Sequence, residues 1–565
     1  MSPTMPVIEA ASPHEALTRD ALASIGDARL GAWLAGRRWF AAKGEPPRTV
    51  RVAAVVPLPW EDGAWVVSEI VTEGARGSAR WHLPLAVWRE QLPRPEAAEA
   101  LAEVRWPEGQ GVVIDAVYDP RFLRHLADTF AQPGSTADHY GASFAAGEWR
   151  WTVETLGHEA FVVPADATIH VASGEQSNTS ILVGGLAILK LFRRLEAGEH
   201  PDVEVTRFLT KEAGFPNTPT LLGTIRLEQG EHATVVGMLQ EYLPDSVDAW
   251  RWTLEAGKAY FSGTRDSGLG TRDSRGSNAL PVPEPRVPSP GNSYPAAAER
   301  LGVITRAMHE ALASEPAEQD LAFAPEPADP DDVDRWAEST RVQIRESLDL
   351  LDRQLAAGAV PKERAAEAQA IARRRDDYLH HVDTLADALH EDAGCVIRHH
   401  GDYHLGQVLR THGGDFMIID FEGEPSRPLL DRRRKHSALR DVAGMLRSFA
   451  YAAATLAVEA GSGLAMAERE TRAARWEREA RDAFLRGYLR GPSVSGGVPH
   501  PPDAPEDHGH GDDEPGFLPE SETNVRRLVA LFELEKVFYE LEYELHNRPN
   551  WAWIPMRGVS KVLVG

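Results

Sequence analysis

The segment HHGDYHLGQV, residues 399–408, gathers three histidines, an aspartate and a glutamine within ten positions. Asp402 precedes Gln407 by five positions, and Asp420, in the later segment MIIDFEGEP, follows Asp402 by eighteen. Kinases place a base aspartate, a carboxamide metal ligand and a metal-binding aspartate in the same order. Phosphoryl transfer needs a carboxylate near the attacking hydroxyl and a cation to neutralise the phosphate oxygens. The spacing therefore predicts phosphoryl transfer, with Asp402 as the base.

The expected metal ligands are all oxygen donors. Gln407 stands where the kinase pattern has asparagine, and a second carboxylate, Glu422, follows Asp420. Amide and carboxylate oxygens suit a hard cation such as Mg²⁺. The apolar run FMIIDFE predicts a strand, on which Asp420 and Glu422 would share one face because side chains alternate. We expect His404 to orient the loop or the base.

Two other interpretations of the histidines remain open. The pattern His400-x-Asp402-x-His404 could bind zinc, as in some hydrolases. Alternatively, the histidines could only hydrogen-bond within a tight loop. The kinase interpretation is preferred because it also gives a role to Lys190 and to the polar loop before it, which the zinc interpretation leaves unassigned.

Lys190 lies in the predicted strand LAILKLF. This context resembles the V-A-I-K strand of kinases, whose lysine holds the α- and β-phosphates of ATP. In kinases an acid on the following helix pairs with this lysine. We expect Glu204, or another acid on the predicted helix VEVTRFLTKEAG, to do so here.

Further contacts to the nucleotide are expected on either side of this strand. The segment MLQEYL, residues 238–243, fits a hinge whose Gln240 and Tyr242 would lie near adenine. The polar loop before Lys190 could bind phosphate through hydroxyl, amide and backbone N–H groups of Ser177, Asn178 and Thr179.

The composition narrows the class of partner. The chain has 565 residues and a formal net charge of −25, which disfavours nucleic acids and anionic membrane surfaces as partners. Cys395 is the only cysteine, so a disulfide framework is excluded. The N-terminal residues lack the pattern of a secretion signal, and no apolar run is long enough to span a bilayer. We expect a cytoplasmic protein that is a monomer.

The length predicts more than one domain, and the patterning divides the chain into four parts. Residues 1–22 are expected to form a flexible tail. Residues 23–158 read as an α+β unit, in which Asp119 caps a helix at DPRFLRHLADTFAQ. Residues 159–243 show a strand–loop–strand pattern, and residues 244–565 are mostly helical.

Two segments interrupt the helical part. Residues 262–294 and 492–520 are rich in proline, glycine and polar residues. We expect both to be disordered insertions because they cannot bury enough apolar area to offset the entropy of ordering.

Four segments together resemble the bacterial maltokinases: EQSNTSILV with AILKLFRRLEAGEHPDVEVTRFLT, HHGDYHLGQVL, IIDFEGEPSRPLLDRRRKHSALRDVAG and FELEKVFYELEYELHNRPNWAWIPMRGV. The resemblance implies a bilobal, protein-kinase-like α+β fold, with residues 23–158 as an N-terminal cap and 159–243 as the nucleotide-binding lobe. It also implies phosphorylation of maltose at its anomeric hydroxyl, with ATP and Mg²⁺, to supply α-glucan synthesis. Asp402, Lys190 and the three metal ligands match the family's motif positions.

Other functions stay open beside this one. A related branch of the superfamily phosphorylates glucosamine, and a catalytically silent scaffold could keep the same fold. A maltose site would combine aromatic rings, which pack on the apolar faces of the sugar, with carboxylates and arginine side chains that hydrogen-bond its hydroxyls. We assign it to Tyr543, Arg548 and Trp551 in the C-terminal segment, although the amphipathic pattern there is also explained by packing alone.

Overall fold

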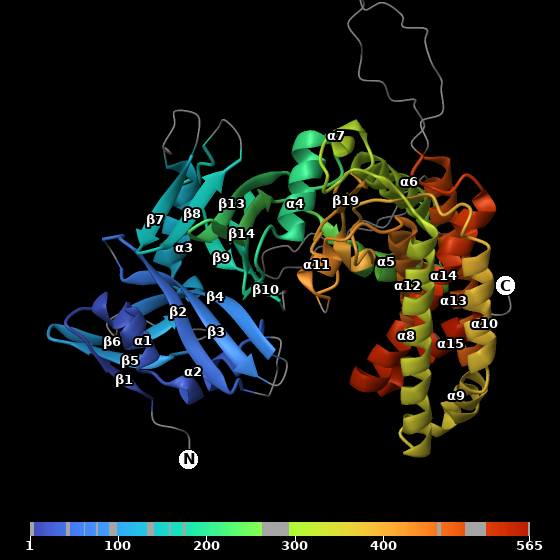
Figure 1. The fold of residues 1–565 in the computed structure, drawn as a ribbon, viewed down its shortest axis with the longest axis horizontal. Helices are drawn as coiled ribbons and strands as arrows, with labels where there is room; N and C mark the ends of the chain where they lie inside the picture. Colours follow the sequence, from blue (N-terminus) through green and yellow to red (C-terminus); the bar gives the residue numbers. More distant parts are fainter. Residues whose placement is uncertain are drawn as a thin grey trace, which may run out of the picture. The chain divides into compact units, whose positions relative to one another are not determined.

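The structure is a computed structural model, and Figure 1 shows its ribbon. It describes residues 5–40, 46–61, 63–74, 77–89, 99–132, 140–156, 160–172, 177–262, 293–425, 427–459, 465–491 and 516–562. The chain divides into two compact units: Met1–Arg207 with Pro219–Pro244, and Phe208–Thr218 with Asp245–Gly565. The predicted cap and nucleotide-binding lobe both fall in the first unit, so the boundary at residue 158 stays a prediction.

A seven-stranded sheet forms the first part of unit 1, with the order β1-β5-β6-β4-β3-β2 and β12 paired to β4. Apolar residues alternate along TVRVAAVVPLP and GAWVVSEIVT, which predicts two strands, and β2 and β3 occupy these segments. The strands are β1 Val7–Glu9, β2 Thr49–Leu58, β3 Trp65–Gly74, β4 Gly77–Arg89, β5 Ala102–Trp106, β6 Gly109–Asp115 and β12 Arg194–Leu195.

The expected flexible tail is wrong for residues 5–22. β1 pairs in parallel with β5, and the helices α1 (Arg19–Ala23) and α2 (Asp27–Ala35) follow it. Ile8, Leu17 and Leu22 are buried in a core shared with the sheet. These side chains are too sparse to give a local period, so only their distant partners show that the segment is ordered.

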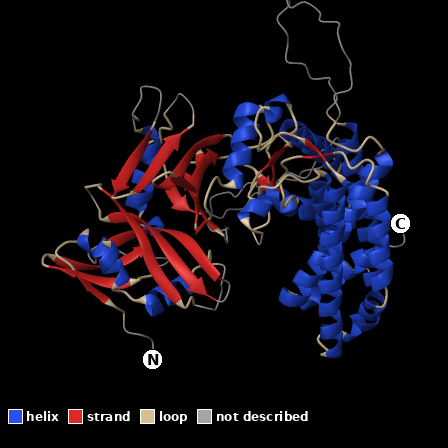
Figure 2. Ribbon diagram, in the orientation of Figure 1, coloured by secondary structure: helices blue, strands red, loops and turns tan. Residues whose placement is uncertain are grey.

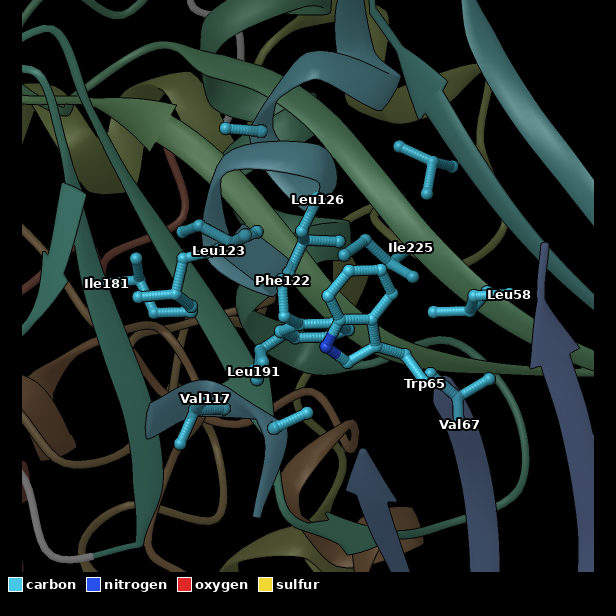
Figure 3. Close-up of a cluster of buried hydrophobic side chains, with 14 of the residues drawn as sticks. Leu58, Trp65, Val67, Val117, Phe122, Leu123, Leu126, Ile181, Leu191 and Ile225 are labelled. Carbon is cyan, nitrogen blue, oxygen red and sulfur yellow. The ribbon is translucent and has the colours of Figure 1, made fainter. Parts of the chain in front are cut away.

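A second seven-stranded sheet, in the order β7-β8-β13-β14-β11-β10-β9, completes unit 1. The helix α3 (Pro120–Asp128) has Asp119 as its N-cap, as predicted. Figure 3 shows Phe122 and Leu126 of α3 in one apolar core with Trp65 of the first sheet and Ile225 of the second. The strands are β7 Gly141–Ala146, β8 Trp149–Thr155, β9 Ile169–Val171, β10 Asn178–Val183, β11 Ala187–Phe192, β13 Leu221–Gln229 and β14 His232–Glu241.

Unit 2 is mostly helical, as predicted, with two small sheets (Figure 2). Helix α6 packs against α13, and α14 packs against α8 and α12. The longer helices are α5 Ala249–Ser262, α6 Tyr294–Leu312, α8 Pro330–Ala356, α10 Arg375–Asp387, α12 Leu439–Glu459, α13 Met466–Arg490, α14 Glu522–Asn547 and α15 Trp553–Val562.

Two expectations for unit 2 concern segments that are mostly outside the described residues. Of the predicted insertions, residues 263–292 and 492–515 are not described, whereas Ser262 ends α5 and α6 begins at Tyr294.

Among the described residues, no helix is both long and apolar enough to cross a membrane.

Candidate active site

The loop that carries Asp402 is held by helix α12. Asp441, in the first turn of this helix, accepts backbone hydrogen bonds from His400 (2.7 Å) and Gly401 (2.9 Å). His309 Nε2 lies 3.2 Å from the same carboxylate. Burial alone would raise the pKa of Asp441, but the hydrogen bond with His309 and the neighbouring histidines outweigh it, and the pKa is lowered. Asp441 is therefore an ionised anchor for the loop.

One face of α12 supports the loop at three points. Asp441, Gly444 and Ser448 are spaced i, i+3 and i+7, which places them on the same side of the helix. The Ser448 hydroxyl accepts a hydrogen bond from the backbone N–H of Leu405 (3.1 Å). A Cβ at Gly444 would lie 2.6 Å from the carbonyl oxygen of Tyr403, so only glycine permits this close approach.

Asp402 lies between two nitrogen-bearing side chains. His404 Nε2 is 3.8 Å from its Oδ2, and Lys536 Nζ, on α14, is 3.6 Å from its Oδ1. Both distances exceed those of a hydrogen bond. The carboxylate therefore keeps lone pairs available for an incoming hydroxyl.

His404 is arranged to donate toward Asp402. Its Nδ1 accepts the backbone N–H of Gly406 (3.0 Å), so the neutral ring carries its proton on Nε2. Burial lowers the pKa of His404, and the opposing effect of Asp402 is smaller. The ring therefore presents its Nε2–H on the side of Asp402, and its predicted role in orienting the loop or the base stays a prediction.

The predicted metal ligands come from a short hairpin and the turn that follows it. Strand β18 (Val408–Arg410) pairs with β19 (Phe416–Ile418), and the pairing continues where Ile419 N–H donates to the Gln407 carbonyl (3.0 Å). This register places Gln407 opposite Ile419, the residue that precedes Asp420, at one end of the hairpin. Asn217 and Thr218 fix the hairpin by hydrogen bonds of 2.8 Å to the carbonyls of Phe416 and Ile418.

The strand predicted over FMIIDFE ends earlier than expected. β19 stops at Ile418, and Asp420 has a φ of +70°, in the left-handed region. Non-glycine residues seldom adopt this conformation, although Asp and Asn do so more readily than others. Asp420 and Glu422 therefore lie in a turn, and the strand alternation that we expected does not set their directions.

The donor set fits magnesium better than zinc. The two carboxylates and one amide are hard oxygen ligands, and Gln407, Asp420 and Glu422 would hold the cation. The zinc interpretation required His400, but its Nε2 lies 3.0 Å from the carbonyl of Ile419 and must donate there. Among the described residues, no group of three or more His, Cys, Asp or Glu side chains is placed to hold a metal ion.

In unit 1, Lys190 forms a buried ion pair with Asp202 of α4 (Pro201–Arg207), at 3.0 Å. Asp202 lies one residue before the predicted helix VEVTRFLTKEAG, because α4 begins at Pro201, and the role expected for Glu204 stays a prediction. Kinases use a lysine–acid pair of this kind to hold the lysine near the phosphates.

Two of the other residues of unit 1 that were predicted to contact the nucleotide are buried in the structure. Thr179 is buried, and its hydroxyl accepts a hydrogen bond from Arg193 Nε (2.8 Å). Gln240 is buried within the sheet, in register with Ile188 of β11. Tyr242 N–H donates to the Leu186 carbonyl (3.0 Å). The roles of these residues, and of Ser177 and Asn178, stay predictions.

The three residues assigned to the sugar lie together in unit 2. The Arg548 guanidinium is 5.5 Å from the Tyr543 ring centre and 5.6 Å from that of Trp551. Arg548 also pairs with the buried Glu544 at 2.7 Å. Tyr543 is 45% exposed, which leaves its ring accessible to a ligand. The predicted core stripe of α14 is confirmed, since Leu534, Phe538, Leu541 and Leu545 are buried, and the sugar role of the three residues stays a prediction.

Comparisons with known proteins point to sugar kinases. Residues 33–119 match the family described as the Maltokinase N-terminal cap domain. The chain is 28% identical over 328 residues to a glucosamine kinase of Streptacidiphilus jiangxiensis, over 57% of this chain and 60% of that protein. It is 27% identical over 391 residues to a glucosamine kinase of Mycolicibacterium smegmatis, over 69% of this chain and 78% of that protein.

A solved structure of a glucosamine kinase in complex with glucosamine, ADP and inorganic phosphate aligns with 95% of this chain and 99% of its own. The TM-score is 0.56 at 20% identity. The chain has the glucosamine kinase fold. The predicted α+β, kinase-like fold with an N-terminal cap is therefore confirmed.

Sequence reasoning assigned no site role to three residues of this kinase fold that surround the Asp402 loop. Asp441 anchors it and Lys536 faces Asp402, while the Tyr539 hydroxyl donates to Glu424, just after the turn that carries the predicted metal ligands. The spacing of Lys536, Tyr539 and Tyr543 along α14, at i, i+3 and i+7, was the available signal. It was hidden because the same helix carries a strong core stripe.

Proposed function

We propose that this protein is an ATP-dependent sugar kinase that phosphorylates maltose at its anomeric hydroxyl to give maltose 1-phosphate for α-glucan synthesis. The observation that carries the proposal is the anchored loop of unit 2, in which Asp402 is partly exposed and Gln407 pairs with Ile419, the residue before Asp420. This is the set of groups that phosphoryl transfer requires.

In this proposal each side chain has one task. Asp402 accepts a hydrogen bond from the attacking hydroxyl and takes its proton, and His404 holds the carboxylate in the orientation that this needs. Lys190, fixed by Asp202, binds the α- and β-phosphates. Magnesium, held by Gln407, Asp420 and Glu422, would supply neutralisation of charge on the phosphate oxygens.

The acceptor is expected to lie along the accessible face of α14. A helix rises 1.5 Å per residue, so Tyr543 lies about 10 Å along the axis from Lys536, the residue that faces Asp402. That span suits two linked sugar rings, the second of which would stack on Tyr543 and Trp551. The match of residues 33–119 to the maltokinase cap also supports maltose.

Glucosamine is the second candidate acceptor. It is favoured by the names of the two relatives and by the ligand of the similar structure. The distinction depends on whether the far end of the α14 face is used, because a single ring that reacts at Asp402 would not reach Tyr543.

The test is a sugar panel assayed with ATP and Mg²⁺. Maltose, glucosamine, glucose and trehalose are each incubated with the full chain and with the D402N variant, and products are identified by mass. We expect maltose to give the highest kcat/KM. A higher kcat/KM for glucosamine would show that glucosamine, and not maltose, is the substrate. ADP binding without turnover of any sugar would indicate a catalytically silent scaffold.

A further inference from the structure

Lys536 belongs to the surroundings of the base although it lies more than a hundred positions away in the chain. Its ammonium is 3.6 Å from Asp402 Oδ1, while His404 faces the other oxygen. The two partners are only 30% and 23% exposed, so water screens them less than it would a surface pair. This lysine is the one cation of α14 that is directed at the catalytic loop by a contact in the structure.

The position of Lys536 is fixed by its neighbours on α14. The preceding residue, Glu535, is buried and binds Arg440 (3.0 Å) and the Ser339 hydroxyl (2.8 Å). One turn later, the Tyr539 hydroxyl donates to Glu424, and its ring lies 5.0 Å from the Lys536 ammonium. The helix is therefore tied to the turn after Asp420 and to the start of α12, which holds the backbone of Lys536 next to the Asp402 loop.

The carboxylates around this loop make a positive charge beside Asp402 useful. Asp402, Asp420, Glu422 and Glu424 occur within 23 positions of the sequence. A divalent cation held by Asp420 and Glu422 would also attract the carboxylate of Asp402, and a coordinated oxygen could no longer accept the hydroxyl proton. An ammonium beside Oδ1 opposes that rotation by Coulomb attraction.

We propose that Lys536 is a positioning residue of the phosphotransferase site, which holds the Asp402 carboxylate toward the acceptor hydroxyl and away from the metal ligands. This inference rests on the proposed function and extends it to a residue supplied by the C-terminal helix. Lys536 acts through Asp402, so its contribution exists only while the carboxylate is present.

The test is a double-mutant cycle measured as kcat with ATP, Mg²⁺ and the best sugar of the panel. K536M keeps the length of the side chain without its charge and is expected to lower kcat by about 100-fold, the size of effect that a misplaced base produces, with the KM for ATP little changed. K536R keeps the charge and should recover most of the loss. In the D402N background, K536M should cause little further loss.

A matched control is K561M, which removes a lysine of α15 that pairs with Glu477 of α13 and should leave kcat within about twofold of the parent. An unchanged kcat in K536M, or an equal loss in both backgrounds, would overturn the proposal. A crystal structure of K536M gives a readout that does not require activity. We expect the Asp402 carboxylate to turn from its position, and an unmoved carboxylate contradicts the inference even if no sugar is a substrate.

Discussion

The side chain of Asp441 receives a 2.7 Å hydrogen bond from the backbone N–H of His400, which lies 41 positions earlier in the chain. This bond joins the first turn of α12 to the loop that carries Asp402. The same carboxylate binds Gly401, so two successive amides are held by one ionised group. The conformation of the loop that carries Asp402, the proposed base, therefore depends on a buried side chain of another element.

Replacement of this anchor should affect both stability and turnover. D441N offers the loop amides a weaker, neutral acceptor and is expected to lower the free energy of unfolding by about 1–3 kcal/mol. The kcat should fall because the loop loses its fixed geometry. Urea unfolding and steady-state kinetics measure the two effects. D383N, at the exposed Arg341–Asp383 pair, is the control that should change neither.

The pH dependence of stability gives a second test of Asp441. Its folded pKa is lowered from the ordinary value of 3.8, so the carboxylate stabilises the fold above that value. This contribution is lost as the pH falls below 3.8 toward the folded pKa. The wild type should therefore lose melting temperature more steeply than D441N below about pH 4. Parallel curves for the two proteins would mean that Asp441 is not an ionised anchor.

Asp420 is best tested with asparagine, because its φ of +70° is tolerated by Asn but strained for Ala. D420N should keep the turn and remove one charged ligand. We expect ADP affinity to become nearly independent of Mg²⁺, whereas the affinity without metal stays unchanged. Calorimetric titration with and without Mg²⁺ measures this. An intact magnesium dependence in D420N would remove Asp420 from the ligand set.

The Lys190–Asp202 pair allows stability and nucleotide binding to be separated. K190M leaves Asp202 buried without its 3.0 Å partner and should destabilise the fold by about 3–5 kcal/mol. The double variant K190M/D202L removes both charges and should regain much of that stability. It should still bind ATP poorly. Recovery of ATP affinity in the double variant would show that Lys190 has only a structural role.

The far end of the α14 face is tested by Y543A. Loss of a ring that stacks on the second sugar should raise the KM for maltose by up to about tenfold, with glucose kinetics unchanged. Y260A replaces another exposed tyrosine, on α5, and serves as the matched control. An equal effect of Y543A on maltose and glucose would indicate that the ring is needed for folding rather than for the disaccharide.

Local periodicity explains which elements could be predicted. The strands around residues 49–74, the capped helix at Pro120 and the core stripe of α14 repeat their apolar residues at the period of their own structure. The pairing of Lys190 with an acid on the following helix was also expected, because the strand and helix are adjacent in sequence. The end of β19 before Asp420 was not predicted, because apolar residues continue in the sequence past the point where the backbone turns.

The sequence alone predicted the chemistry: the types and spacing of Asp402, Gln407 and Asp420 indicate phosphoryl transfer, and the cap and fold followed from the resemblance. Only the tertiary structure decided what holds these groups. Asp441 and Lys536 are distant in the chain from the loop residues that they contact, and the helical spacing around them is equally typical of core packing. Their roles arise from the packing of α12 and α14 around the loop, which brings buried charges within hydrogen-bond or ion-pair distance and so fixes the base.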